Sequence, residues 1–132
     1  MRHLFLLALL LLTAGSRAPL PIVEANDNRL PAGTLRDGTL TLDLVVTMAR
    51  WYPENVGGSF AEVAAFAEEG KAPQIPAPLI RVPAGTKVRV RIRNGLSDST
   101  LTLFGLGVTV DTGASAVQVA PVATLQVAGL HN

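Results

Sequence analysis

The 132-residue sequence contains no cysteine and two histidines, His3 and His131. The lack of cysteine excludes disulfides, thiolate nucleophiles, iron–sulfur ligation and every zinc or copper site that needs a thiolate. Any metal would have to be held by nitrogen or oxygen ligands. The chain must also be stabilised by its core alone, because no disulfide restricts its unfolded state.

The sequence also lacks an excess of charge of either sign. It has 11 Lys and Arg residues against 10 Asp and Glu residues, for a formal net charge of +1. The basic residues are spread along the chain and do not form the cationic cluster that nucleic-acid binding requires. We therefore expect no nucleic-acid partner. The length allows one small domain.

The apolar residues are most concentrated at the N-terminus. The first three residues supply a positive start, residues 4–12 are almost entirely Leu, Phe and Ala, and small residues near Ser16 allow cleavage. This pattern predicts a signal peptide in residues 1–18 and a secreted or periplasmic protein. The apolar run is shorter than the roughly 20 residues that span a bilayer, so we expect no permanent membrane anchor. After cleavage His131 would be the single histidine.

The rest of the chain has the pattern of β-strands. Residues 19–38 carry Pro, Asn, Asp and Gly with little periodicity, and we interpret them as a leader arm or linker. Apolar and polar residues alternate from Leu40 to Met48, which predicts a half-buried strand. Residues 88–93 alternate more strictly, so their valines and isoleucine should face a core while the arginines face water. We place the domain at residues 39–132.

Other strands are predicted at residues 79–82, 100–106, 116–120 and 124–127. Glycine- and proline-containing loops separate them, and residues 83–86 predict a tight turn. Short strands at such regular spacing are typical of an all-β sandwich or barrel.

Residues 59–70 fit two structures. Ser59 and Glu62 form a capping-box pattern and Gly70 closes the segment, as expected for a short helix. A hairpin containing residues 63–67 is the alternative, because local propensity is weak against sheet context. The sequence leaves both open, so the predicted fold contains at most one short helix.

One stretch carries a resemblance to a known family. Residues 72–86 read APQIPAPLIRVPAGT and residues 88–94 read VRVRIRN. This combination resembles the N-terminal cupredoxin (plastocyanin-like) domain of multicopper oxidases, and the similarity runs from about Leu40 to Val127. Ala77 replaces the glycine that usually stands between the two prolines. The resemblance implies a Greek-key β-sandwich and descent from a copper oxidoreductase.

The same resemblance implies that the copper ligands are missing. In the family the next strand carries a His-x-His-Gly motif whose imidazoles bind copper in the trinuclear centre. Thr102 and Phe104 stand at those histidine positions. Type 1 copper needs two histidines and a cysteine, and we interpret His131 as a solvated tail residue. We therefore expect no cofactor, no metal ligand and no catalytic residue in this chain. Copper would enter only if a longer protein supplied ligands.

The resemblance also bears on the C-terminus and on partners. In the family the sandwich continues past the position of Val127 and two more domains commonly follow, so we expect the domain to be truncated. Val122 also replaces the glycine that the family has after Pro121, in the turn that follows residues 117–120. The expected partners are further cupredoxin domains or a second copy of the chain, because an unpaired sheet edge invites association. As an isolated chain it is expected to be a structural or interaction module rather than an enzyme; within a longer protein it would be a fragment of a multicopper oxidase-type oxidoreductase.

A second functional class rests on the sequence Asp111-Thr112-Gly113. This triplet matches the active-site signature of aspartic proteases, in which the aspartate shares a proton with a second one to activate water. The alternative function is therefore a dimeric aspartic protease-like enzyme with Asp111 as its catalytic residue. Against it, the remaining chain is too short for the rest of a protease lobe, and a turn between strands favours the same three residues.

Two other groups of residues have both a structural and a functional interpretation. The arginines at 89, 91 and 93 fit an anion-binding stripe, but we prefer a solvated sheet face that discourages edge pairing. Trp51 and Tyr52 fit ligand stacking, but we prefer core packing because the chain has few other aromatic residues.

Overall fold

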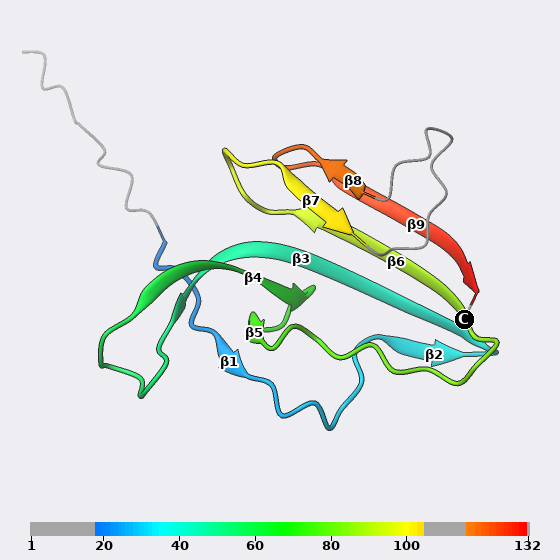
Figure 1. The fold of residues 1–132 in the computed structure, drawn as a ribbon, viewed down its shortest axis with the longest axis horizontal. Coiled ribbons are helices and arrows are strands. Elements are labelled where there is room, and N and C mark those ends of the chain that lie inside the picture. The colour runs from blue at the N-terminus through cyan, green and yellow to red at the C-terminus, as the bar shows by residue number, and fades with distance from the viewer. Residues whose placement is uncertain (1–17, 105–115, 132) are drawn as a thin grey trace, which may run out of the picture.

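A computed structural model describes residues 18–104 and 116–131. These residues form β-strands and no helix (Figure 1). The strands are β1 (Glu24–Ala25), β2 (Thr34–Arg36), β3 (Thr39–Trp51), β4 (Ala61–Glu68), β5 (Gln74–Ile75), β6 (Lys87–Asn94), β7 (Leu101–Phe104), β8 (Ala116–Val119) and β9 (Thr124–His131). None of the described residues belongs to a helix that could cross a membrane. The predicted signal peptide falls almost entirely outside the described residues.

The strands form two sheets. The larger sheet has the order β1-β5-β4-β3-β6-β9, with β2 also pairing with β3, while β7 and β8 form a two-stranded sheet. Pairing in the larger sheet is mixed. β3 is antiparallel to β4 but parallel to β6, and β6 is antiparallel to β9. The molecule is therefore the all-β sandwich that the sequence predicted.

The two central strands are built as their alternating sequences predict. On β6 the side chains of Val88, Val90 and Ile92 are buried, and the arginines between them point outward. Leu42 on β3 lies in register with Val90, so both side chains project from the same face of the sheet. Successive side chains of a strand point to opposite faces, which makes one face of this pair apolar and the other charged.

The apolar face forms a core that joins both sheets. Its buried members are Ala32, Leu40, Leu42, Leu44, Val88, Val90, Ile92, Leu103 and Val119. Most of them come from β3 and β6, while Leu103 lies on β7 and Val119 on β8. The smaller sheet is thus held against the larger one by hydrophobic burial.

Within residues 59–70, residues 61–68 form the strand β4, so the helix interpretation is wrong and the hairpin interpretation is confirmed. β4 runs antiparallel to β3 from the pair Trp51–Ala61 to the pair Leu44–Glu68. The long β3 strand offers backbone groups that a helix could not pair, and β4 satisfies them. This tertiary pairing outweighs the helix propensity of the segment, which is worth only tenths of a kcal/mol per residue.

Residues 19–38, expected to be a leader arm or linker, lie against the sheet. β1 pairs with β5 and β2 pairs with β3, while the side chain of Ala32 is buried in the core. A tight approach follows at Gly33, whose φ is +82°. A Cβ atom there would lie 2.7 Å from the backbone oxygen of Thr41, so the position requires glycine.

The strand predicted at residues 79–82 is absent, and the turn after it is present. Residues 79–82 belong to no strand, although the Ala32 amide donates a hydrogen bond to the Leu79 carbonyl. Prolines on either side of the segment lack the N–H donors that a ladder needs. The Thr86 amide then donates to the Pro83 carbonyl over 3.2 Å and closes the predicted turn before β6.

Candidate functional site

The outer face of the larger sheet carries the main cluster of charged side chains. Arg89, Arg91 and Arg93 project from β6 at every second residue, as the alternation requires. Asp43 on β3 lies directly beside Arg91 in the parallel pair. Glu69 follows β4, and its backbone amide donates to the Asp43 carbonyl over 2.8 Å. Three segments that are distant in sequence therefore meet on this face.

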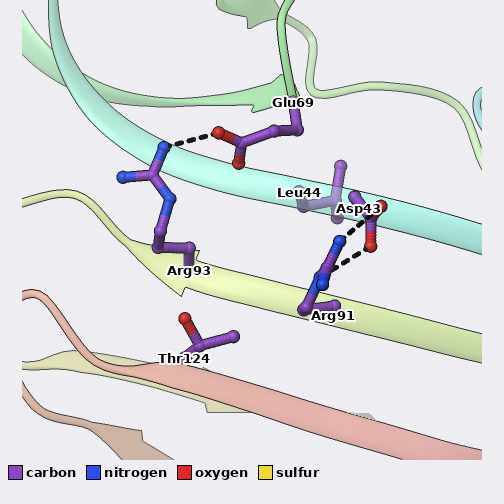
Figure 2. A pocket seen from close by; sticks show the side chains of 6 residues that line it. All are labelled: Asp43, Leu44, Glu69, Arg91, Arg93 and Thr124. Atoms are coloured by element: carbon purple, nitrogen blue, oxygen red, sulfur yellow. Dashed lines mark hydrogen bonds and ion pairs between the residues drawn. The ribbon is translucent and has the colours of Figure 1, made fainter.

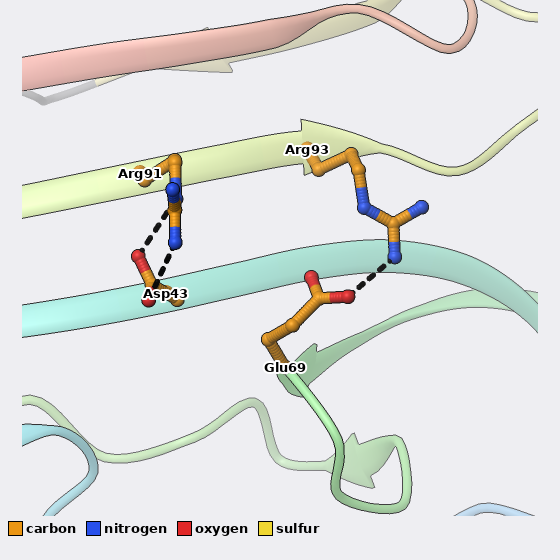
Figure 3. A network of polar contacts seen from close by, with 4 residues as sticks. All are labelled: Asp43, Glu69, Arg91 and Arg93. Carbon is orange, nitrogen blue, oxygen red and sulfur yellow. Dashed lines mark hydrogen bonds and ion pairs between the residues drawn. The ribbon is translucent and has the colours of Figure 1, made fainter.

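Two arginine–carboxylate pairs bridge the strands (Figure 3). The Nε and Nη2 atoms of Arg91 donate to the two carboxylate oxygens of Asp43, each over 2.9 Å. This side-chain hydrogen bond, together with the charge of Asp43, raises the pKa of Arg91 above its usual value. Arg93 Nη2 donates to Glu69 Oε1 over 2.7 Å. Each pair links β6 to a neighbouring part of the sheet.

The pairs surround a shallow hollow of about 290 Å³ (Figure 2). Its lining consists of Asp43, Leu44, Glu69, Arg91, Arg93 and Thr124. Both carboxylates are already neutralised by arginines, and the lining contains neither histidine nor cysteine. A general acid–base pair would need a carboxyl group free to exchange its proton near neutral pH. The two ion pairs at the hollow brace β6 against β3 and against the residue that follows β4.

Arg89 differs from the other two arginines of β6. Its side chain is exposed and forms no ion pair with any residue that the structure describes. A second hollow, of about 280 Å³, lies beside it and is also lined by Thr41, Arg91 and Gln126. The solvated-face interpretation holds for these side chains, but the three arginines are not equivalent, because only Arg89 keeps its charge uncompensated.

Asn94, at the end of β6, is a buried polar residue for which the sequence predicts no role of its own. Its side chain is 0% exposed. The Nδ2 group donates to the carbonyls of Ser99, Val119 and Ala120 over 2.8–3.2 Å, and Oδ1 accepts from the Leu96 amide over 3.0 Å. One side chain therefore ties β6 to the end of β8 in the other sheet. The available signal was its inward position in the alternating strand.

The comparisons with known proteins bear on the fold. No family model and no curated protein matches the chain. Among solved structures, the chain is similar to a multicopper oxidase from Campylobacter jejuni described as a metallo-oxidase, with a TM-score of 0.51 and 18% sequence identity over 83% of the chain. The fold is cupredoxin-like. The chain spans 23% of the length of that oxidase, and at this identity the similarity concerns the fold alone.

The cupredoxin-like sandwich places Thr102 and Phe104 on one face of β7. Both side chains are exposed, Phe104 to 73%, whereas Leu103 between them is buried in the core. A phenyl ring offers no donor atom, and copper sites of this kind use imidazole and thiolate ligands. These two residues do not fit a copper ion. In the described part of the chain, no group of three or more His, Cys, Asp or Glu side chains is placed to hold a metal.

Trp51, Tyr52 and Phe60, at the loop end of the β3–β4 hairpin, do not belong to the core, so the prediction of core packing is wrong for Trp51. Its side chain is 38% exposed. Tyr52 instead contacts Phe60, with 5.5 Å between ring centroids, and the guanidinium of Arg50 lies 4.9 Å from the centroid of Phe60. The strong bend of β3 (Figure 1) carries this end of the hairpin away from the centre of the sandwich.

Three other predicted positions have different outcomes. His131 was interpreted as a tail residue, but its backbone belongs to β9 and pairs with Lys87. Asp111, the catalytic residue of the protease alternative, lies outside the described residues. Val122 adopts a φ of 61° in the turn before β9. A β-branched residue is strained there, and the glycine that the family has at this position would not be.

Proposed function

We propose that this chain is an exported cupredoxin-like domain of multicopper-oxidase descent that serves as a structural or interaction module and has no copper site of its own. The observation that carries the proposal is the exposed pair Thr102 and Phe104 on β7 of a cupredoxin-like sandwich. Strand β7 is present where the resemblance places copper ligands, but the side chains of Thr102 and Phe104 at those positions do not bind the metal.

Other contacts in the described part of the molecule support a structural role for the domain. Arg91 and Arg93 brace β6 against its neighbours, and Asn94 links the two sheets. A buried side chain that is hydrogen-bonded as Asn94 is helps to specify one arrangement of the sandwich. The proposed export rests on the N-terminal apolar run, which is typical of a signal peptide.

In a longer protein the same domain would be a piece of an oxidoreductase. The chain covers 23% of the similar oxidase, so further domains are the first partners to consider. In that setting the ligands and the substrate site would lie on those domains, and this one would supply a supporting surface.

Titration of the purified chain with Cu(II) tests the proposal. We expect no blue absorption and no stoichiometric binding that survives dialysis against a chelator. Any weak electron paramagnetic resonance signal should disappear in His131→Ala, because His131 is the single histidine after signal cleavage and one imidazole holds copper poorly. One retained copper ion per chain, unaffected by His131→Ala, would show a site built from other residues and contradict the proposal.

A further inference from the structure

A cluster of positive charge lies where β2, β3 and β6 come together, near the C-terminal mark in Figure 1. Arg36 on β2 pairs in register with Thr39 on β3, and Thr39 pairs in turn with Lys87 on β6. The adjacent row contains Thr41 and Arg89. Residues in register on neighbouring strands project from the same face. Arg36, Lys87 and Arg89 therefore share the outward face, and we call them the cationic patch.

The cationic patch is not neutralised by its surroundings. Its three side chains are exposed, and none of them forms an ion pair within the described residues. Farther along the same face, Arg91 and Arg93 are compensated by Asp43 and Glu69. Asp37 follows Arg36 in the turn to β3 but forms no ion pair with the patch in the described structure. Positive charge thus accumulates at one end of the face only.

We propose that the cationic patch binds a carboxylate-rich segment of a partner protein. The guanidinium groups of Arg36 and Arg89 match the fork geometry of carboxylates, and Lys87, in the same row as Arg36, adds a flexible side chain with a third positive charge. The hollow beside Arg89 also exposes the Thr41 hydroxyl and the Gln126 amide, which suit the backbone of an extended peptide. The partner's acidic residues would supply the charge that this end of the face lacks.

The same surface fits a nucleic acid poorly. The patch contains three cations, whereas a polyphosphate is bound by many. The formal net charge of the whole chain is only +1. An acidic protein segment needs fewer contacts. Asp43 also lines the hollow beside Arg89, but its charge is compensated by Arg91.

This inference rests on the proposed role as an interaction module and specifies its partner chemistry. The two are tested separately. A copper ion retained by the chain would contradict the proposed function and would not affect the inference about the cationic patch. Absence of peptide binding would contradict that inference and would not affect the copper result.

The test is a fluorescence anisotropy titration with a labelled oligoglutamate peptide at low ionic strength. We expect Arg89→Gln to weaken binding about threefold and the Lys87→Gln/Arg89→Gln variant about tenfold, since exposed charge pairs contribute little individually. Arg29→Gln is the matched control, because Arg29 is exposed on the loop between β1 and β2 and is already paired with Asp27. It should change the affinity by less than about twofold.

Raising the salt to about 0.15 M should weaken binding to the parent chain, because exposed pairs are screened. All variants should keep the thermal unfolding midpoint of the parent, since the altered side chains lie outside the core. Three results would overturn the inference: no binding at low salt, equal losses in Arg29→Gln and Arg89→Gln, or tighter binding of a single-stranded oligonucleotide of the same charge.

Discussion

Replacing Leu42 with alanine should lower the free energy of unfolding by about 3–5 kcal/mol. The Leu42 side chain is 1% exposed and belongs to the core that joins both sheets. Truncation removes buried methyl groups and leaves a cavity that the rigid neighbours on β3 and β6 can fill only in part. A chain without disulfides has little other stabilisation to offset this loss.

The measurement is urea unfolding followed by circular dichroism. Leu35→Ala on β2 is the matched control, because the Leu35 side chain is 48% exposed. Surface changes of this kind usually alter stability by about 0.5 kcal/mol or less. If the two variants lose the same stability, Leu42 does not lie in the core described above.

Replacing Asn94 with alanine should cost about 3 kcal/mol, although the residue is polar. The change removes four hydrogen bonds and leaves the carbonyls of Val119 and Ala120 with one partner fewer at the junction of the sheets. A buried polar group without a partner costs roughly 1–3 kcal/mol. Asn94→Asp keeps the shape of the side chain but replaces the donating Nδ2 group by an acceptor, so it should be at least as destabilising.

Asn55→Ala is the control for this substitution, since Asn55 lies exposed in the β3–β4 loop. Both variants can be compared by the same urea titration, and hydrogen exchange of the Leu96 amide adds a local readout. That amide donates to Asn94 Oδ1, so its exchange should accelerate in Asn94→Ala. Unchanged stability together with unchanged exchange would remove Asn94 as a link between the sheets.

The strands with clear alternation could be predicted from sequence, and the others could not. β3 and β6 were predicted because their apolar residues recur at every second position. β4 reads as a helix locally, and only its pairing with β3 over eight register positions makes it a strand. β1 and β2 are two and three residues long, too short for any periodicity to appear.

The charged cluster on the outer face of the larger sheet could likewise be predicted only in part. The exposure of the β6 arginines follows from alternation, but their different pairing does not. Asp43 reaches Arg91 through the parallel register of β3 and β6, which no local pattern encodes. The cationic patch could not be predicted from the sequence for the same reason. Arg36 lies in the segment interpreted as a linker, and its proximity to Lys87 depends on two successive strand pairings.

The parallel pairing of β3 with β6 sets the arrangement of the sandwich, the arginine pairs and the cationic patch. Because the chain has no cysteine, a double-cysteine variant reports a single contact. Thr41→Cys/Arg89→Cys joins register partners and should form an intramolecular disulfide nearly completely under mild oxidation. In Thr41→Cys/Arg93→Cys the second cysteine lies four residues farther along β6, roughly 13 Å away, and should stay reduced. Equal or reversed yields in the two variants would contradict the fold on which every other conclusion rests.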